Sequence, residues 1–123
     1  MIRNFILVGL GGMIGSMLRY LIALLIKYPS FPLATFIVNF AGCFIIAIVF
    51  GFSLKNQWFD QNWRIFFTTG ICGGFTTFST FSVESYQLLQ QQRYGAFTAY
   101  IALSIIAGLA AVIAGLWLTT HIK

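Results

Sequence analysis

The stretch of sequence that decides the fold reads GICGGFTTFSTFSVE and runs from Gly70 to Glu84. Two adjacent glycines, Gly73 and Gly74, stand in the middle of a predicted apolar span, where their helix propensity is poor. Five hydroxylated residues follow them: Thr76, Thr77, Ser79, Thr80 and Ser82. Freed backbone groups at membrane depth are tolerated only beside protein, water or an ion. We therefore predict a helix break at about residues 73–76, facing an interior site. The alternative is an intact helix whose hydroxyls bond to their own turn.

The composition of the whole chain places this segment in a membrane. Of 123 residues, 59% are hydrophobic and 7% are charged, and the mean hydropathy is +0.91. A soluble domain carries about 25% charged residues, so seven basic and two acidic side chains cannot coat a soluble surface. A soluble domain, a disordered chain and a disulfide-stapled module are excluded. The sequence predicts an all-α integral membrane protein.

The length of the chain sets the number of spans. One helical span needs about 20 apolar residues, so four spans with short loops use nearly the whole chain. We predict a single transmembrane domain over residues 1–123, with the third helix broken in mid-span. The predicted spans are residues 5–26, 33–54, 64–89 and 95–119. Trp58 and Trp63 lie in the most polar connection, as interfacial anchors.

The basic residues bear on the orientation and on the partners of the protein. Four spans put both termini on the same side of the membrane. That side carries four basic residues, and the opposite side carries two, or three if the Arg19 side chain snorkels toward it. These are Arg3, Lys55, Arg64 and Lys123 against Lys27 and Arg93. Because this bias is weak, either the termini are cytoplasmic or the chain inserts both ways, as in antiparallel dimers of small four-span proteins. Basic residues scattered singly argue against nucleic acid, whereas a positive balance near a pore favours anions.

Small residues recur at spacings that allow close helix packing. Ala107, Ala111 and Gly115 repeat every fourth residue in the predicted fourth span, and Gly11 and Gly15 do so in the first. Such stripes let another helix approach closely. They serve either packing within the chain or a dimer interface.

Polar donors lie deep in two other predicted spans. Asn39 is the strongly polar residue of the second span, and its amide should face the interior because burial in hydrocarbon is costly. Its two N–H donors suit an anion, and a helix–helix hydrogen bond is the alternative. Tyr100 and Ser104 lie four residues apart on the fourth span and add further donors.

Phenylalanines alternate with the hydroxyls after the predicted break. Phe75, Phe78 and Phe81 are spaced by three and share one broad helix face. For Phe75 we favour simple packing. Phe78 and Phe81 are candidates to line a path, since the positive edge of an aromatic ring can solvate a small anion weakly.

Two charged residues fall inside predicted spans, and each has two interpretations. Glu84 is either a proton-handling group or, as we favour, a structural acceptor for nearby hydroxyls. Arg19 either draws anions into a vestibule or snorkels to the interface.

The weak and repeated donors suit conduction better than tight binding, because a conducted ion must also leave. No nucleophile–base pair or phosphate loop is apparent, and Cys43 and Cys72 have no metal-ligand spacing. We therefore expect a protein that is not an enzyme and that handles a small anion.

Three stretches resemble the CrcB/Fluc family of fluoride channels, and the resemblance extends over essentially the whole chain. They read GMIGSMLRY at residues 12–20, VNFAGCF at 38–44 and GICGGFTTFSTF at 70–81. The third stretch is highly specific.

The resemblance implies a dual-topology antiparallel homodimer with two pores in a bacterial plasma membrane, exporting fluoride passively from the cytoplasm and protecting against fluoride toxicity. It implies a structural sodium ion on the dimer axis, held by the backbone carbonyls of Gly73 and Thr76, and a vestibule arginine at Arg19. The implied fluoride pathway comprises Asn39, Phe78, Phe81, Ser79, Thr80, Tyr100, Ser104 and Glu84.

Two other functions are alternatives to a channel. A small multidrug-type proton-coupled transporter also has four spans, but it needs an acidic residue in the first span, where this chain has Arg19 and no Asp or Glu. A non-transporting membrane scaffold subunit would explain the Gly and Ala stripes but not the polar cluster of the third span.

Overall fold

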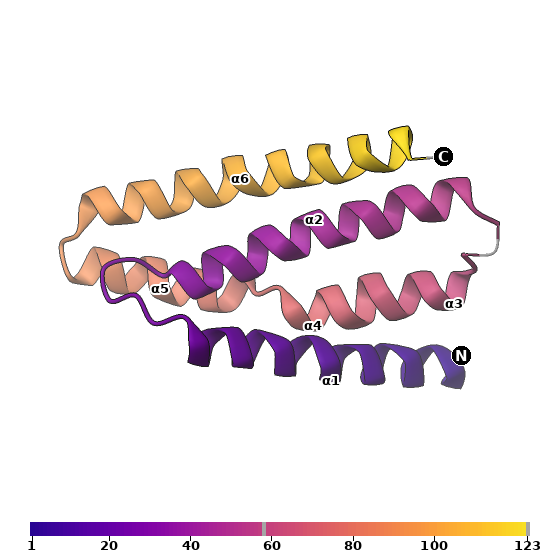
Figure 1. Ribbon diagram of the computed structural model, residues 1–123. Coiled ribbons are helices and arrows are strands. Elements are labelled where there is room, and N and C mark those ends of the chain that lie inside the picture. The colour runs from indigo at the N-terminus through magenta and orange to yellow at the C-terminus, as the bar shows by residue number, and fades with distance from the viewer. Residues whose placement is uncertain (58, 123) are drawn as a thin grey trace.

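Three long helices dominate the fold. In a computed structural model that describes residues 1–57 and 59–122, these are α1 (Ile2–Leu25), α2 (Leu33–Lys55) and α6 (Tyr94–His121) (Figure 1). Within the described part of the chain, these three helices are long and apolar enough to cross a membrane. They confirm the predicted first, second and fourth spans to within three residues at each end. Trp58, a predicted interfacial anchor, and Lys123, a basic residue counted for orientation, lie outside the described residues.

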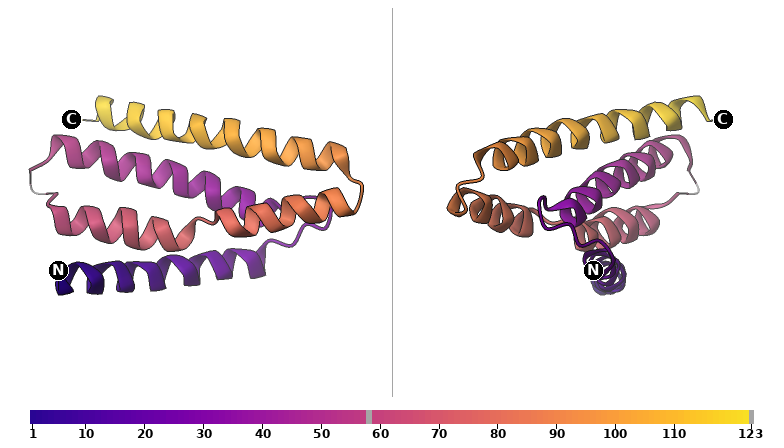
Figure 2. Two further views of the ribbon diagram at one scale, coloured as in Figure 1. Left: turned by 180° about the vertical axis from the view of Figure 1, so that it is seen from behind. Right: turned by 60° about the vertical axis from the view of Figure 1, so that its left-hand side comes forward.

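The predicted third span is a composite of four short pieces. Its elements are α3 (Gln61–Arg64), the π-helix η1 (Ile65–Cys72), α4 (Gly73–Phe75) and α5 (Phe78–Gln90). The Gly73 N–H donates a hydrogen bond to the Thr68 carbonyl, five residues back, which is the spacing of a π-helix. Two further views show α5 following α4 end to end along the bundle (Figure 2). The composite segment therefore returns the chain from the end that holds both termini to the opposite end.

The helix does break, but later than the glycine pair predicts. Gly73 and Gly74 are helical, whereas Thr76 (ψ 157°) and Thr77 (φ −150°) have extended backbone. A Cβ atom added to Gly74 would lie 2.5 Å from the Gly12 carbonyl oxygen. This glycine therefore serves the close approach of α1 to α4. The prediction of a break beginning at Gly73 is therefore corrected: the extended residues are Thr76 and Thr77. The helix breaks there because side chains of α2 and of Thr77 accept the backbone N–H bonds that the helix gives up.

The helices pack as two pairs. α2 lies mainly against α6, and α1 lies mainly against η1 and α4. Small residues permit both contacts: a Cβ on Gly15 would lie 2.1 Å from the Ile71 carbonyl oxygen, and one on Gly115 would lie 2.8 Å from the Ala47 Cβ. At Gly15 and Gly115, the small-residue stripes therefore serve packing within the chain.

The outer surface of the bundle is strongly apolar. Ile106, Leu109 and Ile113 on α6 are 65%, 62% and 69% exposed. Soluble monomers rarely expose contiguous apolar patches of this kind. The exposed surface therefore matches a hydrocarbon environment, as the composition predicts.

Replacing Gly15 by alanine tests the α1–η1 contact. We expect Gly15→Ala to lower the free energy of unfolding by about 1–3 kcal/mol, because the new methyl group meets backbone atoms that cannot move aside. Gly9→Ala is the matched control, since nothing lies within 4 Å of its added Cβ, and better helix propensity should raise stability by about 0.5–1 kcal/mol. Thermal unfolding of both purified variants in detergent measures the difference. Equal midpoints would contradict the described packing.

Candidate functional site

The centre of the site is a two-way hydrogen bond between the Asn39 side chain and the backbone of Thr77. Asn39 Nδ2 donates to the Thr77 carbonyl at 3.1 Å, and the Thr77 N–H donates to Asn39 Oδ1 at 2.9 Å. In a continuous helix, the Thr77 N–H would bond to the Gly73 carbonyl instead. The α2 amide thus replaces the helical partner at the break. One of the two amide N–H groups that we assigned to an anion is engaged here.

The hydroxyl of Thr77 starts the next helix. Thr77 Oγ1 accepts the Thr80 N–H at 3.2 Å and donates to Thr80 Oγ1 at 3.0 Å. This is N-capping, which satisfies a donor that the helix leaves free. On the other side of the break, Thr76 Oγ1 donates to the Cys72 carbonyl at 2.9 Å. Both threonines therefore use their side chains to end one helix and begin another.

These side-chain bonds release two backbone carbonyls from their helical partners. The N–H groups that would bond to the Gly73 and Thr76 carbonyls in an unbroken helix are those of Thr77 and Thr80, and both donate to side chains instead. Carbonyl oxygens of this kind are the ligand type that hard cations prefer. The two residues assigned to a sodium ion by the family resemblance thus carry suitable donor atoms.

Glu84 on α5 joins three helices through two hydroxyl groups. Thr35 Oγ1 on α2 donates to Glu84 Oε1 at 2.8 Å, and the Tyr100 hydroxyl on α6 donates to Glu84 Oε2 at 2.7 Å. The carboxylate therefore acts as an acceptor for nearby hydroxyls, the role that we favoured. Tyr100 is fully buried and commits its single O–H to this bond.

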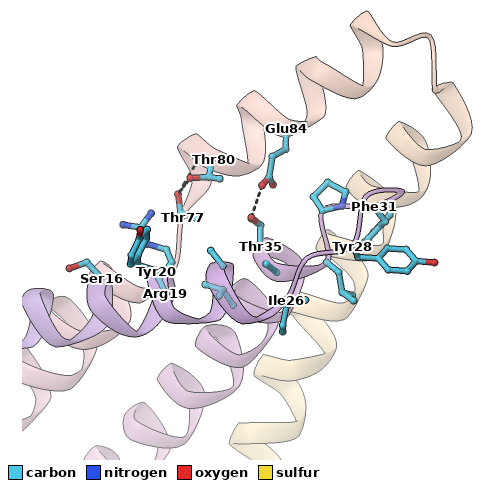
Figure 3. Close-up of a pocket in the computed structure, with 15 residues that line it drawn as sticks. Ser16, Arg19, Tyr20, Ile26, Tyr28, Phe31, Thr35, Thr77, Thr80 and Glu84 are labelled. Carbon is cyan, nitrogen blue, oxygen red and sulfur yellow. Dashed lines mark hydrogen bonds between the residues drawn. The ribbon is translucent and has the colours of Figure 1, made fainter.

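A first cavity of about 450 Å³ lies between α1, α2, α5 and the loop of residues 26–32 (Figure 3). Its polar lining includes Ser16, Arg19, Thr77, Thr80 and Glu84. The Nε atom of Arg19 is buried and has no hydrogen-bond partner among the described residues. Arg19 therefore brings a positive charge to this cavity, and its Nε–H is not committed to another described residue.

A second cavity of about 440 Å³ lies on the other side of the break and has an aromatic wall. Phe78 and Phe81 line it together with Asn39 and Ser104, and their ring centroids are 5.9 Å apart. The Oγ atom of Ser104 is buried and lacks a partner within the described part of the chain. A buried hydroxyl without a hydrogen-bond partner costs free energy unless a group or ion in the cavity accepts a hydrogen bond from it.

The structure thus divides the predicted site residues into groups. Arg19, Thr80 and Glu84 line the first cavity, whereas the second is lined by Asn39, Gly73, Thr76, Phe78, Phe81 and Ser104. Two predicted residues line neither: Ser79 is exposed beside the break, and Tyr100 lies behind Phe81 at a ring-centroid distance of 4.9 Å.

Sequence reasoning missed the roles of two threonines. Thr77 lines both cavities and forms the Asn39 bond, and Thr35 holds Glu84. A signal for Thr35 was present in its spacing, since it precedes Asn39 by four residues and so lies on the same face of α2.

The Asn39–Thr77 pair is tested by Asn39→Asp. Aspartate keeps an acceptor for the Thr77 N–H but loses the donor and turns an anionic oxygen toward a carbonyl oxygen. We expect a loss of about 1–3 kcal/mol in unfolding free energy, measured by thermal unfolding in detergent. Asn56→Asp is the matched control, because it also removes an amide-to-carbonyl bond, from Asn56 to Phe52, but outside the break. If both variants unfold at the same temperature, the pair does not support the break.

Comparison with known proteins connects this arrangement to a family. Residues 6–116 match the family described as CrcB-like protein, Camphor Resistance (CrcB). A protein of Azobacteroides pseudotrichonymphae genomovar. CFP2 is 53% identical over 122 residues, covering 97% of this chain and 98% of the relative. A protein of Flavobacterium psychrophilum is 44% identical over 117 residues, covering 93% and 94% respectively.

A third relative, from Leptospira interrogans serovar Lai, is 39% identical over 120 residues, covering 94% of each chain. All three relatives bear the name fluoride-specific ion channel FluC. The resemblance seen in the three sequence motifs is therefore confirmed, and the chain belongs to the CrcB-like family.

Proposed function

We propose that this protein is a fluoride-specific ion channel of a cell membrane. The names of its relatives support this function directly. The observation in the fold that carries it is the buried Ser104 hydroxyl, which has no partner among the described residues, in a residue that lines one cavity with Asn39, Phe78 and Phe81. The relatives are ion channels, which supports a protein that is not an enzyme. Neither a multidrug-type exchanger nor a scaffold subunit is favoured by these relatives.

The second cavity offers hydrogen-bond donors on neutral side chains. The Ser104 O–H and the second N–H of Asn39 can donate to an anion, and the ring edges of Phe78 and Phe81 present partial positive charge. Fluoride holds its hydration water strongly, so several donors must replace that water together. Because each donor is neutral, the ion can also leave, as conduction requires.

The first cavity supplies a fixed positive charge to the same route. Arg19 attracts anions toward Thr77 and Thr80, and Thr77 lines both cavities. We assign Ser79 and Thr80 to the hydroxyl groups that an anion meets beside the break. Glu84 and Tyr100 hold α5 and α6 together beside this route.

We propose four membrane crossings, and the path of the chain supports this number. α1, α2 and α6 are each long enough to cross, and both termini lie at one end of the bundle (Figure 1). In this proposal, the composite segment of residues 61–90 is the fourth crossing, because an even number of crossings leaves both termini on one side. We place this single domain in a bacterial plasma membrane, where passive export of fluoride would protect the cell from fluoride toxicity.

A second copy of the chain would complete the pores. Phe78 is 80% exposed and Gly73 is exposed, so one bundle leaves the break and part of its aromatic wall on the surface. We propose an antiparallel homodimer of dual topology with two pores, in which the partner covers this surface. The weak charge bias between the two ends of the bundle supports insertion in both orientations.

A sodium ion at the break fits the donor atoms available there. Gly73 and Thr76 would hold it through the carbonyl oxygens that their helical partners have released. Bound there, the ion would satisfy freed backbone oxygens inside the membrane, where they are otherwise costly.

Replacing each of the two phenylalanines by isoleucine tests the aromatic wall. We expect Phe78→Ile and Phe81→Ile to cut fluoride efflux from liposomes at least tenfold, because an aliphatic side chain keeps the apolar volume but lacks the positive ring edge. A fluoride electrode records release, and chloride release is recorded in parallel. Size-exclusion chromatography checks that assembly is unchanged. Undiminished efflux in both variants would remove these residues from the pore.

Ser104→Ala tests the buried hydroxyl. A hydrogen bond to a charged group contributes about 1.5–3 kcal/mol, so losing this donor should slow fluoride efflux by roughly tenfold or more. Ser53→Ala is the control, because the Ser53 hydroxyl bonds to the Phe50 carbonyl and lines neither cavity. Equal efflux by the two variants would mean that Ser104 does not contact the ion.

A further inference from the structure

A third cavity, unrelated to the break, lies at the end of the bundle that carries the N-terminus. It is a groove of about 480 Å³ between the first turns of α1 and the start of the composite segment. This volume falls within the range of about 300–1,000 Å³ that is typical of small-ligand sites. Its lining consists of Arg3, Leu7, Asp60, Asn62, Trp63 and Phe66.

Two opposite charges face this groove without forming an ion pair. Arg3 interacts electrostatically with Asp60, whose pKa is lowered mainly by the Trp63 N–H and to a smaller degree by Arg3. Both residues belong to the described part of the chain, and no guanidinium nitrogen of Arg3 lies within 4.0 Å of a carboxylate oxygen of Asp60 there. Asp60 is one of only two acidic residues in the sequence. The groove is therefore lined by a guanidinium and a carboxylate that do not bind each other directly.

Asp60 retains capacity for another donor. Oδ1 accepts the Asn62 and Trp63 N–H groups at 2.9 and 3.2 Å, and Oδ2 accepts Asn62 Nδ2 at 2.9 Å. A carboxylate offers about four lone-pair sites. One site on Oδ2 thus remains for a ligand.

The remaining walls of the groove suit an acyl chain at the membrane surface. Leu7 and Phe66 are apolar and lie one helical turn deeper than Arg3 and Asn62. Trp63 is 52% exposed and stacks on Phe67 at a centroid distance of 6.0 Å. Tryptophan is enriched at membrane–water interfaces. The groove thus combines a charged rim with an apolar floor where headgroups meet hydrocarbon.

We propose that this groove binds a phospholipid whose headgroup carries a primary ammonium group, as in phosphatidylethanolamine. The guanidinium of Arg3 binds the phosphate, Asp60 Oδ2 accepts an ammonium N–H, and an acyl chain lies along Leu7 and Phe66. A choline headgroup has no N–H for Asp60. A glycerol headgroup leaves the lipid anionic, and Asp60 repels it.

Native mass spectrometry of the purified protein tests this assignment. The protein is mixed with equimolar phosphatidylethanolamine, phosphatidylcholine and phosphatidylglycerol, and the retained lipids are counted. We expect the first lipid to be retained over each of the others by about tenfold, which corresponds to about 1.4 kcal/mol.

Two variants and one control separate the contributions of the charges. Asp60→Asn keeps a good helix N-cap but should abolish the preference over phosphatidylglycerol. Arg3→Gln should reduce retention of both phosphatidylethanolamine and phosphatidylglycerol. Arg64→Gln removes an exposed cation of α3 that does not line the groove, and it should behave as wild type.

Equal retention of the three lipids by the wild type would overturn the proposal, as would a preference that Asp60→Asn leaves intact. The readout is bound mass, so the result does not depend on fluoride transport. Efflux from liposomes lacking phosphatidylethanolamine, measured on the same preparation, reports the channel function separately.

Discussion

The fold depends on the pair of hydrogen bonds that joins the Asn39 side chain to the Thr77 backbone. A helix cannot break inside a membrane unless its freed backbone groups find partners, because each unsatisfied group costs several kcal/mol in hydrocarbon. One amide on α2 engages both the N–H and the carbonyl of the same residue. The composite segment can therefore end α4 and begin α5 at that point, while Thr77 and Thr80 supply the remaining cap.

The break determines where polar groups collect in an otherwise apolar bundle. On one side lies the cavity with Arg19, and on the other lies the cavity with Phe78, Phe81 and Ser104, while Thr77 lines both. Glu84 holds α5 to α2 and α6 through Thr35 and Tyr100, so the second half of the broken segment keeps its position. Among the residues that the structure describes, the two buried side-chain polar atoms without a partner are Arg19 Nε and Ser104 Oγ, and both residues line these cavities. Their placement makes a route for a small anion chemically reasonable.

The sequence predicted the elements better than their connections. Spans one, two and four were located closely because some twenty consecutive apolar residues leave little freedom in a membrane. The break was predicted at about residues 73–76 from the poor helix propensity of Gly73 and Gly74, yet both glycines are helical and the extended residues are Thr76 and Thr77. Packing outweighs the poor helix propensity of glycine here, since α1 approaches Gly74 so closely that a Cβ atom on this residue would meet the Gly12 backbone. Tyr100 was predicted as a donor beside Ser104, but its hydroxyl is committed to Glu84, a pairing across 16 residues that spacing on one helix does not reveal.

By itself, the sequence determined that the chain is a helical membrane protein, that the helix after residue 61 breaks at a polar cluster, and that the chain belongs to the CrcB-like family. Composition and motifs suffice for these conclusions because hydropathy acts locally and the family motifs are contiguous. Only the tertiary structure decided that Asn39 holds the break, that Glu84 accepts two hydroxyls, and that Arg3 and Asp60 face one groove. Each of these depends on which faces of distant helices meet, and close packing through Gly15, Gly74 and Gly115 sets that alignment.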